Sequence, residues 1–117
     1  ICLMVKTLVW LDDMRDPKTS DWLLRYAPDF FYNGGNIVWV KNYLEFTNWV
    51  TENGVPDMIC FDHDLGEGKS GYDAAKFLID WCFENNAKVP NWNAQSSNPV
   101  GVQNINQLMK NAKKHLG

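Results

Sequence analysis

The chain has 117 residues, of which 45% are apolar and 14% aromatic, so it can bury the core of one small domain and is not a disordered tail. Its formal net charge of −3 argues against a broad basic surface for binding duplex DNA. No apolar stretch reaches the roughly 18 residues that a membrane span requires, so we expect no membrane partner.

The start of the chain and its cysteines both bear on cellular location. Ile1–Leu3 is apolar but no hydrophobic core of a signal peptide follows it, so we expect residues 1–3 to be a non-native or flexible start before Met4. Cys60 lies in an apolar run and Cys82 in a helical pattern, and we interpret both as buried thiols. These features favour a cytoplasmic protein.

The first predicted element is a strand over residues 6–11, apolar on both faces like a central strand of a parallel sheet. Thr19 or Ser20 can cap a short helix over residues 21–26. We expect Pro28 to stop this helix, because the residue before a proline avoids the helical conformation.

A second strand is predicted over residues 37–40, after a glycine-rich turn. Asn42 can cap the helix that follows over residues 43–52, whose apolar positions suit one amphipathic face. A third strand over residues 58–61 is fully apolar, which indicates burial on both sides.

The clearest helix spans residues 72–84, with Ser70 as its N-cap and Asp73 completing a capping box. A short fourth strand is predicted over residues 89–95. Pro99 begins a last helix that ends in lysines, and these cations suit the negative end of the helix dipole.

Strand and helix therefore alternate four times, which predicts an α/β fold. We expect a small three-layer, doubly wound sheet of about four mainly parallel strands. Such folds bind ligands beyond the carboxyl ends of their strands. Polar residues follow three of the predicted strands: Asp12-Asp13, Asp62-His63-Asp64 and Gln95-Ser96-Ser97-Asn98.

Crowded carboxylates repel one another, so the acidic strand ends need a cation, a proton or hydrogen-bond donors. Asp12 and Asp13, with Asp62 or Asp64, could form an oxygen-only site for Mg²⁺ or another divalent cation. Alternatively, one aspartate of each pair caps the following loop, or Arg15 neutralises the cluster.

Other polar residues near these ends could act on a phosphate. Arg15 can grip a phosphate with two donors or form a plain salt bridge. His63 lies between two carboxylates that could hold its tautomer for acid–base work, although a structural role is equally open. The turn that begins with Ser96, Ser97 and Asn98 could bind phosphate or ribose oxygens, or simply cap the last helix.

Four motifs in order make the chain resemble a known family. They are L-D-D-x-R-x-P at 11–17, F-D-H-D-L-G at 61–66, G-Y-D at 71–73 and S-x-N-P-x-G at 96–101. Together they resemble the cyclic-phosphate-processing receiver-like domain of bacteria and phages, a divergent relative of response-regulator receivers. The resemblance implies a receiver- or flavodoxin-like fold, truncated because the fifth strand of a receiver is missing.

The resemblance also implies a function: a phosphodiesterase that binds and hydrolyses a nucleotide-like cyclic phosphate. The ligand could be a cyclic nucleotide, a cyclic oligonucleotide, an RNA end or an ADP-ribose derivative, and a phage could use it for counter-defence in the host cytoplasm. The implied catalytic residues are Asp12, Asp13, His63, Asp64 and Gln95. The implied ligand-binding residues are Arg15, Asp62, Ser96, Ser97 and Asn98, with Asp12, Asp13 and Asp62 as metal ligands.

Gln95 departs from the family, which usually has a histidine at this position. A glutamine can still form hydrogen bonds but cannot transfer protons near neutral pH. The chain is therefore an inactivated variant, a natural binder without turnover, or a protein in which this position was never catalytic.

Two alternatives to hydrolysis stay open: a non-catalytic protein that sequesters such ligands, and a receiver-like switch phosphorylated on Asp62 or Asp64. The sequence does not predict the oligomeric state.

Overall fold

A computed structural model describes residues 5–66 and 68–116 of the chain. The start that we expected to be non-native or flexible, residues 1–3, lies outside the described residues. None of the helices within the described ranges is both long and apolar enough to cross a membrane.

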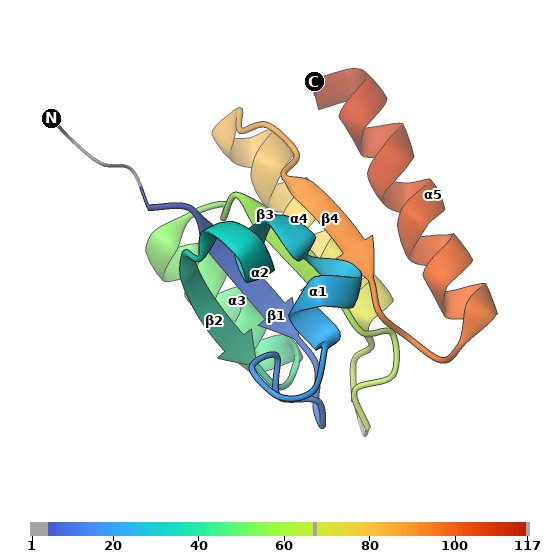
Figure 1. The fold of residues 1–117 in the computed structure, drawn as a ribbon. Helices are drawn as coiled ribbons and strands as arrows, with labels where there is room; N and C mark the ends of the chain where they lie inside the picture. Colours follow the sequence, from blue (N-terminus) through green and yellow to red (C-terminus); the bar gives the residue numbers. More distant parts are fainter. Residues whose placement is uncertain (1–4, 67, 117) are drawn as a thin grey trace, which may run out of the picture.

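Four parallel strands form one sheet in the order β2-β1-β3-β4 (Figure 1). They are β1 (Thr7–Leu11), β2 (Asn36–Val40), β3 (Met58–Phe61) and β4 (Asn91–Ala94). The register pairs Leu11 with Val40 and with Phe61, and Phe61 with Ala94. All four strands therefore end at the same level, and the residues that follow them emerge along one edge of the sheet.

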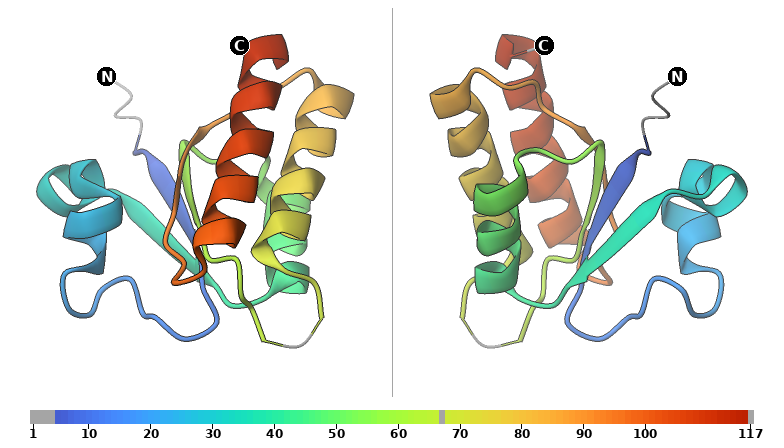
Figure 2. Two further views of the ribbon diagram at one scale, coloured as in Figure 1. Left: turned by 90° about the vertical axis from the view of Figure 1, so that its right-hand side faces the viewer. Right: turned by 90° about the vertical axis from the view of Figure 1, so that its left-hand side faces the viewer.

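Helices cover both faces of this sheet (Figure 2). On one face lie α1 (Trp22–Tyr26) and α2 (Pro28–Asn33). On the other lie α3 (Tyr43–Asn53), α4 (Gly71–Asn85) and α5 (Pro99–Leu116). This arrangement confirms the predicted three-layer α/β fold, and the sheet is entirely parallel.

Strand β1 is the centre of both cores. Leu8 and Trp10 point into the core beneath α1 and α2, whereas Val9 and Leu11 point into the core beneath α3, α4 and α5. All four side chains are fully buried. The apolar run predicted for a central strand thus follows from burial on both faces of the sheet.

The predicted thiols and helix caps are largely confirmed. Cys60 and Cys82 are both free and buried. The side chain of Asn42 accepts a hydrogen bond from the Glu45 amide at the start of α3. Ser70 and Asp73 form the predicted capping box at the start of α4.

Two details of the sequence prediction were wrong, and one was incomplete. Helix α1 ends at Tyr26, before Pro28, as predicted, but Pro28 itself occupies the first position of a second helix, α2, where its missing N–H costs nothing. Neither Thr19 nor Ser20 caps α1; the cap residue is Asp21, and it makes no side-chain cap hydrogen bond. Strand β4 is shorter than the predicted range 89–95, because only Asn91–Ala94 pairs with β3.

Strand β4 has one buried and one polar face. Trp92 and Ala94 pack against the core beneath α5, whereas Asn91 is exposed and Asn93 donates a hydrogen bond to the Tyr26 carbonyl. Polar side chains on one face suit a strand that α1 and α2 cover only in part.

The capping box of α4 provides a test of the fold. Replacing Ser70 with alanine removes the acceptor of the Asp73 amide, so we expect the free energy of unfolding to fall by about 1 kcal/mol. Urea denaturation measures this change, with Lys18→Ala at an exposed position as the control. An unchanged midpoint for Ser70→Ala would contradict the assigned cap.

Candidate functional site

The hydrogen-bond ladder of the sheet continues one residue beyond β1, β3 and β4. The Asp12 amide donates to the Val40 carbonyl at 3.0 Å, and the Asp62 amide donates to the Leu11 carbonyl at 2.9 Å. The Gln95 amide donates to the Phe61 carbonyl at 2.8 Å. Asp12, Asp62 and Gln95 are therefore held side by side at the carboxyl edge.

A hollow of about 230 Å³ opens at this edge. Six of the ten predicted site residues line it: Asp12, Asp13, Arg15, Asp62, Asp64 and Ser97. Met14 and Gly66 complete its wall, whereas His63, Gln95, Ser96 and Asn98 do not line it. The sequence thus located the hollow but could not sort the residues facing it from those supporting it.

Asp12 uses its two carboxylate oxygens differently. Its side chain is only 1% exposed, and Oδ1 accepts hydrogen bonds from the amides of Met14 and Arg15 at 3.0 and 2.9 Å. Oδ2 is buried without a hydrogen-bond partner, and the nearest cation is Nη1 of Arg15 at 3.6 Å. One oxygen therefore caps the loop, while the other remains available to a ligand.

Asp12, Asp13 and Asp62 bring one carboxylate oxygen each to within 4.8 Å of one another. Asp62 is 7% exposed, and this burial, together with the negative charge of Asp12, raises its pKa to about 7 against the opposing effect of Arg15. Asp64 extends outward, with its side chain 62% exposed. Of the two candidates left open by the sequence, Asp62 is therefore the one that joins the acidic cluster.

Three contacts position Arg15 beside this cluster. Its Nη1 donates a hydrogen bond to the main-chain oxygen of Gln95, and its guanidinium lies 5.0 Å from the centre of the Trp22 ring. The Trp10 indole donates to the Arg15 carbonyl at 2.9 Å. The sequence analysis assigned neither tryptophan to the site, although Trp10 lies in β1 just before Arg15 and Trp22 lies in α1 just after it. Which side chain packs on Arg15 depends on how the loop between β1 and α1 folds.

His63 is supported by Asp64 and by the start of α5. Its Nδ1 lies 3.0 Å from Oδ1 of Asp64. Its ring contacts Gly101 so closely that a Cβ atom at position 101 would overlap it. At the start of α4, a Cβ atom at Gly71 would likewise overlap the main chain of Asp62. Glycines at these two positions therefore let the two helices approach the site.

Gln95 lies behind the hollow. Its side chain is 0% exposed, and its amide donates to the Leu11 carbonyl at 3.1 Å. It contributes to the site through its main-chain oxygen, which accepts from Arg15. A catalytic role for this side chain stays a prediction, and its position favours the view that it is structural.

The turn from Ser96 to Asn98 combines capping and exposure. Ser96 Oγ accepts from the Asn98 amide, and Asn98 Oδ1 accepts from the Gly101 amide, each at 3.1 Å. These two side chains therefore stabilise the start of α5, as the capping alternative requires. Ser97 is exposed and is the residue of this turn that reaches the hollow.

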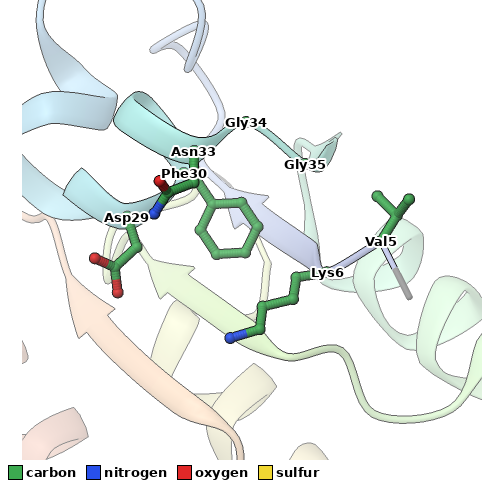
Figure 3. A pocket seen from close by; sticks show the side chains of 7 residues that line it. All are labelled: Val5, Lys6, Asp29, Phe30, Asn33, Gly34 and Gly35. Atoms are coloured by element: carbon green, nitrogen blue, oxygen red, sulfur yellow. The ribbon is translucent and has the colours of Figure 1, made fainter. Parts of the chain in front are cut away.

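A larger hollow of about 550 Å³ lies between α2 and the beginning of β1. Figure 3 shows its seven lining residues, with the Phe30 ring at the centre. It lies at the amino ends of the strands and brings together one lysine and one aspartate but no carboxylate cluster. The acidic hollow is therefore the better candidate for a functional site.

Comparison with known proteins agrees with the geometry. The model of the family described as the cyclic-phosphate processing receiver domain matches residues 7–111. No curated protein matches the chain.

Solved structures share the fold at low identity. A fusion of the yeast Spc42 trimeric coiled coil to another structure has a TM-score of 0.61 at 18% identity, covering 92% of this chain, which spans 65% of that fusion. The N-terminal domain of a response regulator/sensory box/GGDEF protein from Carboxydothermus hydrogenoformans has a TM-score of 0.54 at 19% identity, covering 87% of this chain and 74% of that one. A response regulator receiver protein from Sinorhizobium medicae WSM419 has a TM-score of 0.52 at 13% identity, and the match covers 92% of this chain and 97% of that protein. These likenesses show the fold alone.

The raised pKa of Asp62 predicts a pH-dependent stability. Between about pH 4 and pH 7 the folded protein keeps a proton that the unfolded chain releases, so its free energy of unfolding falls as the pH rises, by up to about 4 kcal/mol. Asp62→Asn should remove the contribution of Asp62 to this decrease in the free energy of unfolding. Urea denaturation in EDTA at several pH values across this range measures the decrease, with Asp80→Asn on an exposed face of α4 as the control. An equal slope in wild type and Asp62→Asn would contradict the assignment.

The carboxylate cluster also predicts a response to Mg²⁺. A cation bound by Asp12, Asp13 and Asp62 relieves their repulsion, so millimolar Mg²⁺ should raise the melting temperature and EDTA should reverse the rise. Asp13→Asn should abolish this response, because it removes a ligand without touching the loop cap of Asp12. Asp64→Asn, which removes the same charge at the rim, should retain it; equal responses in the two variants would exclude this ligand set.

Proposed function

The chain belongs to the cyclic-phosphate processing receiver domain family, and we propose that it binds a nucleotide-like cyclic phosphate in the acidic hollow and hydrolyses one of its phosphodiester bonds. The observation that carries this proposal is the meeting of three carboxylates with a positioned guanidinium at one edge of the sheet. Carboxylates and an arginine in one hollow suit a ligand that carries both a phosphate and a bound cation.

Arg15 and Ser97 are the groups that would hold the phosphate. The Arg15 guanidinium has donors beyond the Nη1 hydrogen bond to Gln95, and stacking on Trp22 limits its motion. The exposed Ser97 hydroxyl can donate to a second phosphate oxygen. The hollow is smaller than the roughly 300–1,000 Å³ of typical ligand pockets. It therefore fits the phosphate with its ester ring and leaves the base outside.

The three carboxylates fit a divalent cation. Oδ2 of Asp12 is buried without a hydrogen-bond partner, and an oxygen-only donor set matches Mg²⁺. Asp12, Asp13 and Asp62 would hold the ion. When bound, it would supply positive charge against the phosphate oxygens.

Opening a cyclic phosphodiester requires proton transfer. The oxygen of a water molecule bonds to phosphorus and gives up one proton to a base, while the bond to one ester oxygen breaks and that oxygen takes up one proton. His63 is the side chain that we assign to this transfer, because it directly follows Asp62 of the acidic cluster and its ring contacts Gly101 in the first turn of α5. A proton on Nδ1 would be held by Asp64 at 3.0 Å, leaving Nε2 free to accept one.

The proposal predicts hydrolysis that depends on His63. Candidate substrates are 2′,3′- and 3′,5′-cyclic mononucleotides, cyclic oligonucleotides, RNA with a 2′,3′-cyclic phosphate end and cyclic ADP-ribose, each with Mg²⁺ and analysed by chromatography. His63→Ala should lower kcat by about 10²–10⁴-fold. The control is His115→Ala, which removes the chain's other histidine from the exposed end of α5. Failure of every substrate to bind or react would refute the proposal.

Gln95 stands where the family usually has a histidine, and a glutamine cannot transfer a proton near neutral pH; this supports a second candidate function, sequestration without turnover. Calorimetry and product analysis of the wild type and Gln95→His separate the two. Tight binding without product in both proteins would favour sequestration, whereas product from wild type favours hydrolysis. If the chain is encoded by a phage, hydrolysis could remove a host signal or heal RNA ends, and sequestration could remove a host signal.

The position of Asp62 supports a third candidate, a phosphorylation switch. Asp62 directly follows β3 and lies beside the Asp12-Asp13 pair in a receiver fold. Acetyl phosphate with Mg²⁺ should then add one phosphate to wild type but not to Asp62→Asn, as measured by intact mass. An unmodified wild-type mass would exclude this function.

A further inference from the structure

Charge is divided unevenly along the chain. Residues 85–117 contain four of the eleven Lys and Arg residues and none of the fourteen Asp and Glu residues. The net charge of this part is therefore +4, against −7 for residues 1–84. Such asymmetry within one chain is a sign of an anionic partner for the basic part.

The basic part forms a groove, lined by Trp92 of β4 and by Lys110, Lys113 and Lys114 of α5, with a volume of about 310 Å³. We call it the Trp92 groove. All three lysines are exposed. Among residues 5–66 and 68–116, the ion pairs involve Arg15, His63 and Lys76 as the cationic partners and none of these lysines.

The half-buried Trp92 ring is held in place where it lines this groove. Its indole N–H donates to Oδ1 of Asn106 at 2.9 Å, which fixes the ring orientation and satisfies its polar atom. Lys113 Nζ lies 5.7 Å from the ring centre, so a cation already rests over the indole. A ligand with a flat π face can replace this cation and keep the lysine as a partner for its negative charge.

The outward face of α5 continues the groove with uncharged donors and acceptors. Ile105, Met109 and Ala112 face the core, while the exposed amides of Gln103, Gln107 and Asn111 lie along the helix that carries the lysines. No carboxylate occurs anywhere on this helix. A surface of amides and lysines around an aromatic ring suits bases and phosphates.

We propose that the Trp92 groove binds single-stranded nucleic acid, with one base stacked on Trp92 and adjacent phosphates paired with Lys110, Lys113 and Lys114. Three lysines give too small a patch for a duplex, and the chain as a whole is acidic. A membrane surface fits less well, because the exposed apolar residue of α5, Val100, lies at the opposite end of the helix.

The Trp92 groove is separate from the acidic hollow. The two share no residue, and they lie toward opposite ends of α5, whose 18 residues span about 27 Å (Figure 1). This inference therefore does not depend on the proposed hydrolysis. Asp13→Asn, which alters the acidic hollow, should leave binding to the groove unchanged.

Fluorescence anisotropy with a labelled 12-nucleotide oligouridylate tests the inference. The triple variant Lys110→Gln, Lys113→Gln and Lys114→Gln should weaken binding at least 10-fold in 50 mM salt. It should also reduce the slope of log affinity against log salt by about 2, because three phosphate contacts are lost. The matched control replaces Lys6, Lys18 and Lys76 with glutamine and has the same net charge.

Stacking is tested at Trp92. Trp92→Leu should weaken binding by about 5–100-fold, whereas Trp92→Phe, which keeps an aromatic face, should lose less. Circular dichroism and thermal melting establish that each variant is folded before its affinity is compared.

Four results would each overturn the inference: no binding of the oligonucleotide at 50 mM salt, equal losses in the two lysine triples, unchanged affinity in a folded Trp92→Leu protein, or a requirement for Asp13. Binding to vesicles with anionic headgroups, or to polyglutamate, in place of the oligonucleotide would also overturn it. Binding that is lost only with the groove lysines and Trp92 would support it.

Discussion

The common level at which the four parallel strands end is the constraint on which the site depends. Because the ladder continues for one residue past β1 and β3, the peptide groups of Asp12 and Asp62 are bonded to neighbouring strands. The main chains at these two residues therefore cannot separate without breaking those hydrogen bonds. The sheet therefore holds negative charges together against their repulsion, and the raised pKa of Asp62 is a consequence.

Packing on either side of the sheet supports this charged edge. The smaller core contains Trp10, whose indole bonds to the loop after β1, and Trp22 stacks on Arg15 from α1. On the other side, Gly71 and Gly101 allow the first turns of α4 and α5 to contact Asp62 and His63. Both layers thus stabilise the site, although neither supplies an acidic ligand to it.

The two charged regions lie toward different ends of the same long helix. α5 begins beside the acidic hollow, next to the turn that carries Ser97, and ends beside the Trp92 groove. A negatively charged chain can therefore present a local positive surface, because all acidic residues precede residue 85. The net charge of −3 is a sum over the whole chain and does not represent the local charge of the acidic hollow or of the Trp92 groove.

Alternation of apolar runs with amphipathic segments was enough to predict an α/β sheet with polar strand ends, since burial on both faces leaves a clear pattern in a short strand. The same pattern predicted that the acidic pairs lie at strand ends. It also predicted the helix caps at Asn42 and Ser70, because capping depends on neighbours in sequence. Only the tertiary structure assigned Asp62 to the cluster, buried the Gln95 side chain against the Leu11 carbonyl and placed Trp22 beside Arg15. The first two depend on strand register and on contacts between distant segments, and the third depends on how the loop between β1 and α1 folds. Local sequence patterns carry no signal for these.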